Sequence, residues 1–225
     1  MDHAYSPDDK VFPQKRALQT LFNIFVLFAV LITCILVLLS GGNQTLPSGF
    51  YTKALDVLFI GALFFGFVFL RYPPEQSGLN FNRLRLNLLF GFCFGAAGLA
   101  VAMTGRYYLI QSGSEIFKLN LSGLSFAYFL LYPITATVQE VVVKGVFQNY
   151  FNTVLENNGK NKFLAVIFSS LIFAQFHLVF GIFIALCAFL FGIVTGMFYQ
   201  KTRSVVGISI AHFLIGSGFV QFASF

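Results

Sequence analysis

Charged residues are scarce in this sequence of 225 residues, since Asp, Glu, Lys and Arg together make up only 10% of it. Soluble domains contain roughly 25% charged residues. Hydrophobic residues account for 57% of the chain, and 32 residues are Phe. A soluble globule of this composition would expose large apolar patches, which soluble proteins rarely do, and disorder requires low hydrophobicity. The composition therefore favours a polytopic membrane protein.

Cysteines and basic clusters are also lacking. Cys34, Cys93 and Cys187 lie in separate apolar stretches without metal-type spacing, which argues against a disulfide framework or a zinc knuckle. We interpret them as small buried hydrophobic residues. The net charge is +6, but Lys and Arg are scattered between apolar runs. Because nucleic-acid binding needs a basic face or stripe, we expect no nucleic-acid partner.

Long apolar runs dominate what is present. Windows of about 19 residues give candidate membrane spans at residues 17–40, 52–70, 86–104, 122–140, 163–179, 181–200 and 205–223. Connectors rich in Gly, Pro, Asn and Ser separate these runs. We therefore predict an all-α fold, a polytopic transmembrane helical bundle of about seven spans.

The distribution of basic residues predicts how this bundle is oriented. Ten Lys and Arg residues lie in segments that share a side with the N-terminus, and three lie in the opposite segments. Since basic residues near spans stay on the cytoplasmic side, we expect the N-terminus inside and the C-terminus outside. The predicted parts are a cytoplasmic N-terminal tail (1–16), N-terminal transmembrane helices (17–110) and a core that carries the polar motifs (111–225).

A few ionisable residues fall in or next to the apolar runs, namely Asp56, Glu140, Lys144, His177 and His212. Such groups cost several kcal/mol in a bilayer unless they are paired or face a wet cavity, so each is a candidate for function. One buried His is more often a packing residue, but two of them with a Glu favour a site. A small transporter is disfavoured because the spans show no repeat.

The residues around these groups predict local contacts. Glu140 and Lys144 are four residues apart, so one alternative is a simple ion pair within a helix that lets both charges lie at the membrane boundary. Phe173 precedes His177 by one helical turn and should pack over its imidazole. Three further features follow in the sequence: the small-residue pair Gly192 and Gly196, which permits close helix approach, a turn with Thr202, and Ser204, which can cap the last helix.

Together these blocks resemble the CPBP (Abi) family of membrane proteins, which includes type II CAAX prenyl endopeptidases and bacteriocin-processing or self-immunity proteins. The family pattern is E-E-x-x-x-R, then F-x-x-x-H, then a G-x-x-x-G helix with a Thr and Ser turn leading to H-x-x-x-N. The matching residues, in order, are Gln139, Glu140 and Lys144, then Phe173 and His177, then Gly192, Gly196, Thr202, Ser204, His212 and Gly216. The resemblance covers about residues 122–220.

The resemblance implies hydrolysis of a peptide bond within the membrane, with Glu140, His177 and His212 as the catalytic residues. In the family, the first Glu and the second-motif His activate water, while the third-motif His and its Asn stabilise the oxyanion. The implied partners are the lipid bilayer and a peptide or membrane-protein substrate, and the implied location is a bacterial plasma membrane. No cofactor is required, although two His and one Glu would suffice for an open zinc site.

Three departures from the pattern leave a second alternative open. Gln139 replaces the first Glu and cannot act as a base, and Lys144 replaces an Arg that would bind bidentately. Gly216 replaces the Asn and has no side-chain donor, although Ser217 could supply one from another direction. Glu140 could take over the base role if its helix were rotated. The chain is thus predicted to be either an endopeptidase or a non-catalytic scaffold or immunity protein of the same fold.

Overall fold

The computed structural model describes residues 31–32, 35, 57–61, 63–69, 77–111, 126–155, 159–178 and 182–220. Within these ranges the chain is helical and contains no strand, which confirms the predicted all-α class there. The elements are η1 (Phe65–Phe69), α3 (Leu84–Gln111), α4 (Phe126–Glu140), η3 (Val141–Gln148), α5 (Asn149–Val154), α6 (Gly159–Phe176), α7 (Ile182–Thr202) and α8 (Val206–Val220). The predicted tail (1–16), Asp56, Cys34 and most of the first two predicted spans lie outside the described residues.

Several helices have the length and composition of membrane spans. Among the described residues, three helices are long and apolar enough to cross a bilayer, at Leu84–Gly105, Leu130–Val154 and Ile182–Thr202, and a shorter apolar helix covers Val206–Gly218. The chain is therefore a helical membrane protein. A total of about seven spans and the N-in, C-out orientation stay predictions.

The predicted end of the fourth span at residue 140 is wrong, because α4 continues through η3 and α5 to Val154. One alternative from the sequence puts Glu140 and Lys144 at a membrane boundary as an ion pair. In the structure both side chains are buried inside the protein, at 0% and 1% exposure, so they do not end the helix. The π-helical stretch η3 follows Glu140 directly, and π-helical turns are often found at functional sites.

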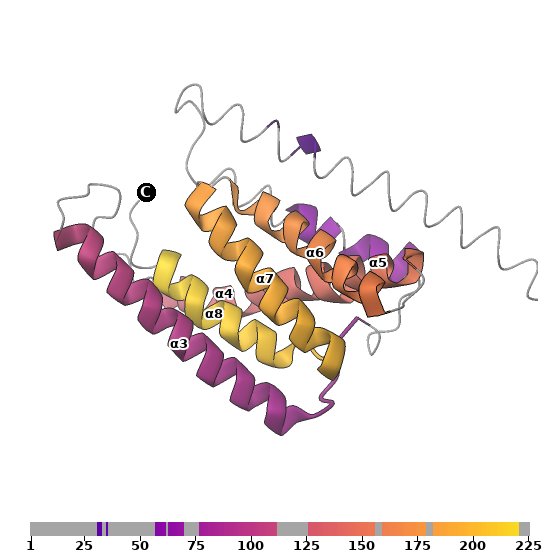
Figure 1. Cartoon of the computed structure of the whole chain (residues 1–225), viewed down its shortest axis with the longest axis horizontal. Helices are drawn as coiled ribbons and strands as arrows, with labels where there is room; N and C mark the ends of the chain where they lie inside the picture. The colour runs from indigo at the N-terminus through magenta and orange to yellow at the C-terminus, as the bar shows by residue number, and fades with distance from the viewer. Residues whose placement is uncertain are drawn as a thin grey trace, which may run out of the picture.

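Helices α3 and α8 run side by side (Figure 1), and small residues bring their backbones together. A Cβ added to Gly207 of α8 would lie 2.2 Å from the carbonyl oxygen of Asn87, and one added to Gly91 of α3 would lie 2.6 Å from the Gly207 oxygen. Such close approach is typical of helix packing in membranes. It fixes where α8, and therefore His212, lies.

Helix α7 packs on α6 through the predicted small-residue pair. A Cβ on Gly192 would lie 2.9 Å from the Ser170 side chain, and one on Gly196 would lie 2.8 Å from Val166. The prediction that these glycines permit close helix approach is confirmed. Their backbone carbonyls also take part in the candidate site described below.

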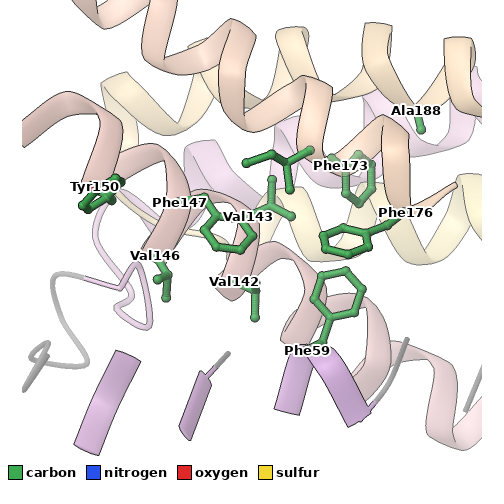
Figure 2. Packing of buried hydrophobic residues seen from close by; sticks show 10 residues of the cluster. Phe59, Val142, Val143, Val146, Phe147, Tyr150, Phe173, Phe176 and Ala188 are labelled. Carbon is green, nitrogen blue, oxygen red and sulfur yellow. The ribbon is translucent and has the colours of Figure 1, made fainter. Parts of the chain in front are cut away.

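The main apolar core forms where η3 meets α6 (Figure 2). Val142, Val143 and Phe147 of η3 are at most 1% exposed. Figure 2 shows the Phe176 ring next to that of Phe59, and their centroids are 4.7 Å apart. This packing holds the end of α6, which carries Phe173, against the helix that carries Glu140.

The prediction that the cysteines are buried is wrong for the two that the structure describes. Cys93 is exposed and Cys187 is half-buried, so neither is the buried residue that the sequence suggested. Cys93 lies between Phe92, itself 56% exposed, and Phe94. In a membrane protein an apolar side chain gains as much from lipid as from the interior, so hydrophobicity alone does not predict burial.

Candidate active site

Glu140 and His212 form a buried pair between α4 and α8. Glu140 Oε1 lies 2.8 Å from His212 Nδ1, and the two residues are 0% and 5% exposed. Because the carboxylate oxygen accepts, Nδ1 carries the proton. The second carboxylate oxygen, Oε2, is buried and has no hydrogen-bond partner among the described residues. A buried carboxylate oxygen left without a donor is costly, so Glu140 is suited to receive a proton from a third group.

His177 joins this pair from the end of α6. Its Nδ1 lies 2.8 Å from the carbonyl oxygen of Phe173, and therefore donates. The neutral ring then carries its lone pair on Nε2, the nitrogen suited to accept a proton. The centroids of the His177 and His212 rings are 6.3 Å apart.

The Phe173 ring lies against both imidazoles. Its centroid is 4.4 Å from that of His177 and 5.4 Å from that of His212, edge-on to the latter. The prediction that Phe173 packs over the His177 imidazole is confirmed. Since Phe173 is only 2% exposed, it keeps the space between the two imidazoles apolar and fixes their separation.

Lys144 is bonded to α7 and not to Glu140. Its Nζ donates to the carbonyl oxygen of Gly192 at 2.8 Å, and the ion pair found for Glu140 is with His212. Four residues further on, Gln148 Nε2 donates to the carbonyl of Gly196 at 3.0 Å. Donors four residues apart on η3 therefore bind carbonyls four residues apart on α7, and the two hydrogen bonds fix the position of η3 along α7. The alternative of a simple Glu140–Lys144 ion pair at a membrane boundary is therefore wrong.

The turn before α8 anchors that helix, as predicted for Thr202 and Ser204. Ser204 Oγ donates to the carbonyl of Asn80 at 2.7 Å and accepts from the N–H of Val206, the first residue of α8, at 3.4 Å. Thr202 is buried, and its Oγ1 donates to the carbonyl of Phe198. In addition, Val205 N–H donates to the carbonyl of Gly78. The N-terminus of α8 is thus fixed to the loop that precedes α3.

The residues at the family departures lie in different surroundings. Gln139 is only partly buried, whereas its neighbour Glu140 is fully buried and bonded to His212. A Cβ added to Gly216 would lie 1.8 Å from the hydroxyl oxygen of Tyr132. The hydroxyl of Ser217 is buried without a hydrogen-bond partner. Glu140 therefore reaches His212 without the first Glu of the pattern, and a tyrosine fills the space beside Gly216.

The site residues that could ligate a metal make hydrogen bonds within the protein. Among the residues that the structure describes, no three of these side chains form a cluster of the kind that holds a metal ion. Glu140 and His212 pair with each other, and His177 Nδ1 is taken up by the Phe173 carbonyl.

Tyr132 and Gln148 lie near the site but belong to none of the sequence motifs described above. Gln148 could have been found from its spacing, because residues 140, 144 and 148 repeat every four positions, as do Gly192 and Gly196. Tyr132 gives no such signal, since only the fold shows that it reaches α8.

The arrangement brings together one carboxylate and two imidazoles in a buried, apolar setting. Such a set can remove a proton from a water molecule and return it to a leaving group. A low-dielectric setting also strengthens hydrogen bonds to a developing charge.

Comparison with known proteins gives a match to the segment that carries the site residues. Residues 121–217 match the family model of Rce1-like type II CAAX prenyl endopeptidases, and this range includes Glu140, His177 and His212. No curated protein and no solved structure gave a match. The segment that builds the site is thus similar to the Rce1-like type II CAAX prenyl endopeptidases, which confirms the resemblance seen in its motifs.

Proposed function

We propose that this membrane protein is an endopeptidase that hydrolyses a peptide bond of a membrane-associated substrate. The observation that carries the proposal is the buried meeting of Glu140 and His212 at 2.8 Å, with His177 beside them. Burying the Glu140 Oε2 atom without a hydrogen-bond donor destabilises the fold, and such a perturbed carboxylate is suited to accept a proton.

In the proposed reaction, Glu140 Oε2 and His177 Nε2 orient a water molecule, and Glu140 takes its proton. The water oxygen bonds to the carbonyl carbon of the substrate while the carbonyl π pair moves to oxygen. The tetrahedral intermediate then collapses, the C–N bond breaks, and the proton passes to the departing amine. The products are one carboxylate and one protonated amine, with no oxidant or reductant. In this reaction His212 donates its Nδ1 proton in a hydrogen bond to Glu140 Oε1 and so orients the carboxylate that takes the proton of the water.

The proposed substrate class, prenylated CAAX proteins, is taken from the family description, which reads type II CAAX prenyl endopeptidase. A peptide anchored in the membrane by a prenylated cysteine could approach a site built between apolar helices. We place the protein in a plasma membrane of bacterial type, crossing it about seven times.

A second function rests on Gln139. This neutral amide stands where the family pattern has the first Glu, and an amide cannot take a proton from water. On this alternative the chain is a non-catalytic scaffold or immunity protein that binds a membrane-protein partner, for example in response to a bacteriocin.

The test uses the full-length protein in lipid vesicles with a farnesylated, fluorophore-quencher peptide ending in a CAAX sequence. We expect cleavage by the wild-type protein, with both product masses identified, and at least a hundredfold lower rate for His177→Ala combined with His212→Ala. The same peptide without the farnesyl group serves as substrate control. Absence of wild-type cleavage, or equal cleavage by the double-histidine variant, would overturn the endopeptidase proposal and favour the scaffold.

A further inference from the structure

The face of α8 that carries His212 continues one turn further to Gly216, where a phenol hydroxyl takes up the neighbouring space. A Cβ added to Gly216 would lie 1.8 Å from the Tyr132 hydroxyl oxygen and 2.8 Å from the ring carbon that bears it. Any side chain at 216 would therefore displace Tyr132. Glycine at this position is what allows the tyrosine to reach α8.

Tyr132 and Glu140 both belong to α4, and the positions that they contact on α8 are one helical turn apart. Glu140 contacts His212, and the Tyr132 hydroxyl lies at Gly216, four residues further along α8. The Tyr132 and His212 rings are perpendicular, with centroids 6.2 Å apart. The phenol and the imidazole therefore line the same part of the site.

We propose that the Tyr132 hydroxyl is a catalytic hydrogen-bond donor to the carbonyl oxygen of the peptide bond being cleaved. The proposal rests on the proposed function and adds a residue to its site. A phenol is a neutral donor that keeps its proton, and its hydrogen bond strengthens as negative charge develops on the carbonyl oxygen. Because Gly216 offers no side-chain donor, the Tyr132 hydroxyl of α4 is the donor next to that position.

The kinetic test compares Tyr132→Phe with wild type in the vesicle assay with the farnesylated peptide. Loss of one oxyanion donor lowers kcat by about a hundred- to a thousandfold, and we expect KM to change by less than about threefold, because the ground-state carbonyl gains little from the donor. Tyr107→Phe makes the same chemical change at a tyrosine of α3 that is 60% exposed, and should leave kcat unchanged.

A pair of exchanges separates donation from simple filling of space. Gly216→Asn alone should lower activity, because its Cβ collides with the Tyr132 hydroxyl. Combined with Tyr132→Ala, the asparagine gains room and brings a donor amide to the same region. We expect the double variant to exceed both Tyr132→Ala and Gly216→Asn in kcat by about tenfold or more. A tyrosine that only fills space would give no such recovery.

A stability measurement tests the contact without any turnover. Gly216→Ala should lower the thermal unfolding temperature by several degrees more in the wild-type background than in the Tyr132→Phe background, because the hydroxyl is the nearest atom.

The outcomes are distinct. No cleavage by wild type overturns the proposed function and this role with it. Wild-type cleavage with an unchanged kcat in Tyr132→Phe overturns the role of Tyr132 alone, and a loss confined to Ser217→Ala would assign the donor to Ser217 instead.

Discussion

Replacing Gly207 with alanine tests whether the packing of α8 on α3 sets the position of His212. The new Cβ would lie 2.2 Å from the carbonyl oxygen of Asn87 and 2.8 Å from its carbonyl carbon, both backbone atoms. Ordinary van der Waals contact begins at 3.4 Å, so the helices must separate by about 1.2 Å. Because a backbone cannot rotate away as a side chain can, α8 has to move.

The expected magnitude combines two opposing effects. Overpacking costs about 1–3 kcal/mol, while alanine improves on glycine in a helix by about 1 kcal/mol. The net loss is about 0–2 kcal/mol, which lowers the unfolding temperature by up to about 8 °C for a chain of this length. A displacement of about 1 Å at a catalytic group can lower the rate about a hundredfold, so activity should fall much more than stability.

The assay measures thermal unfolding and peptide cleavage on the same vesicle preparation. Gly105→Ala is the matched control, since Gly105 is also in a helix but a Cβ there meets nothing within 4 Å. It should raise stability slightly and leave the cleavage rate unchanged. A Gly207→Ala protein as stable and as active as Gly105→Ala would refute the reasoning, because the close contact would then not position His212.

Two further substitutions test the parts that hold the site. Phe173→Leu should lower the unfolding temperature and the cleavage rate together, because the ring contacts with His177 and His212 are worth about 0.5–1.5 kcal/mol each; a normal rate would show that the aromatic ring does not orient the imidazoles. Ser204→Ala should cost about 1–2 kcal/mol in thermal unfolding, since it removes the bond to Asn80 and the cap of α8; unchanged unfolding would show that this turn does not anchor the helix.

Much of the fold and of the site could be predicted from the pattern of apolar and polar residues. The positions of α3, α6, α7 and α8 follow from apolar runs, and the meeting of His177, His212 and Glu140 follows from placing rare polar residues on neighbouring helices. Phe173 over His177 follows from a spacing of one turn. The apolar runs and the Phe173 spacing use only local periodicity and the cost of charge in lipid, whereas the grouping of Glu140, His177 and His212 also rests on the family resemblance.

Other features depended on contacts between helices. The extension of α4 to Val154 could not be seen, because charge at Glu140 and Lys144 marks a boundary only when it faces water or headgroups. Here Lys144 is satisfied by a glycine carbonyl of another helix. Likewise, nothing local to Gly216 shows that Tyr132 fills its space. Which residues of different helices contact each other is set by the packing of the whole bundle.

The most direct test of the central claim compares two neighbouring residues, Glu140 and Gln139, in the cleavage assay. Glu140→Gln keeps the shape of the side chain but removes the proton acceptor beside His212, whereas Gln139→Ala removes an amide that is only partly buried. We predict at least a hundredfold loss of kcat for Glu140→Gln and a change of less than about threefold for Gln139→Ala. Equal activity of Glu140→Gln and wild type would contradict the claim that this buried carboxylate carries the reaction.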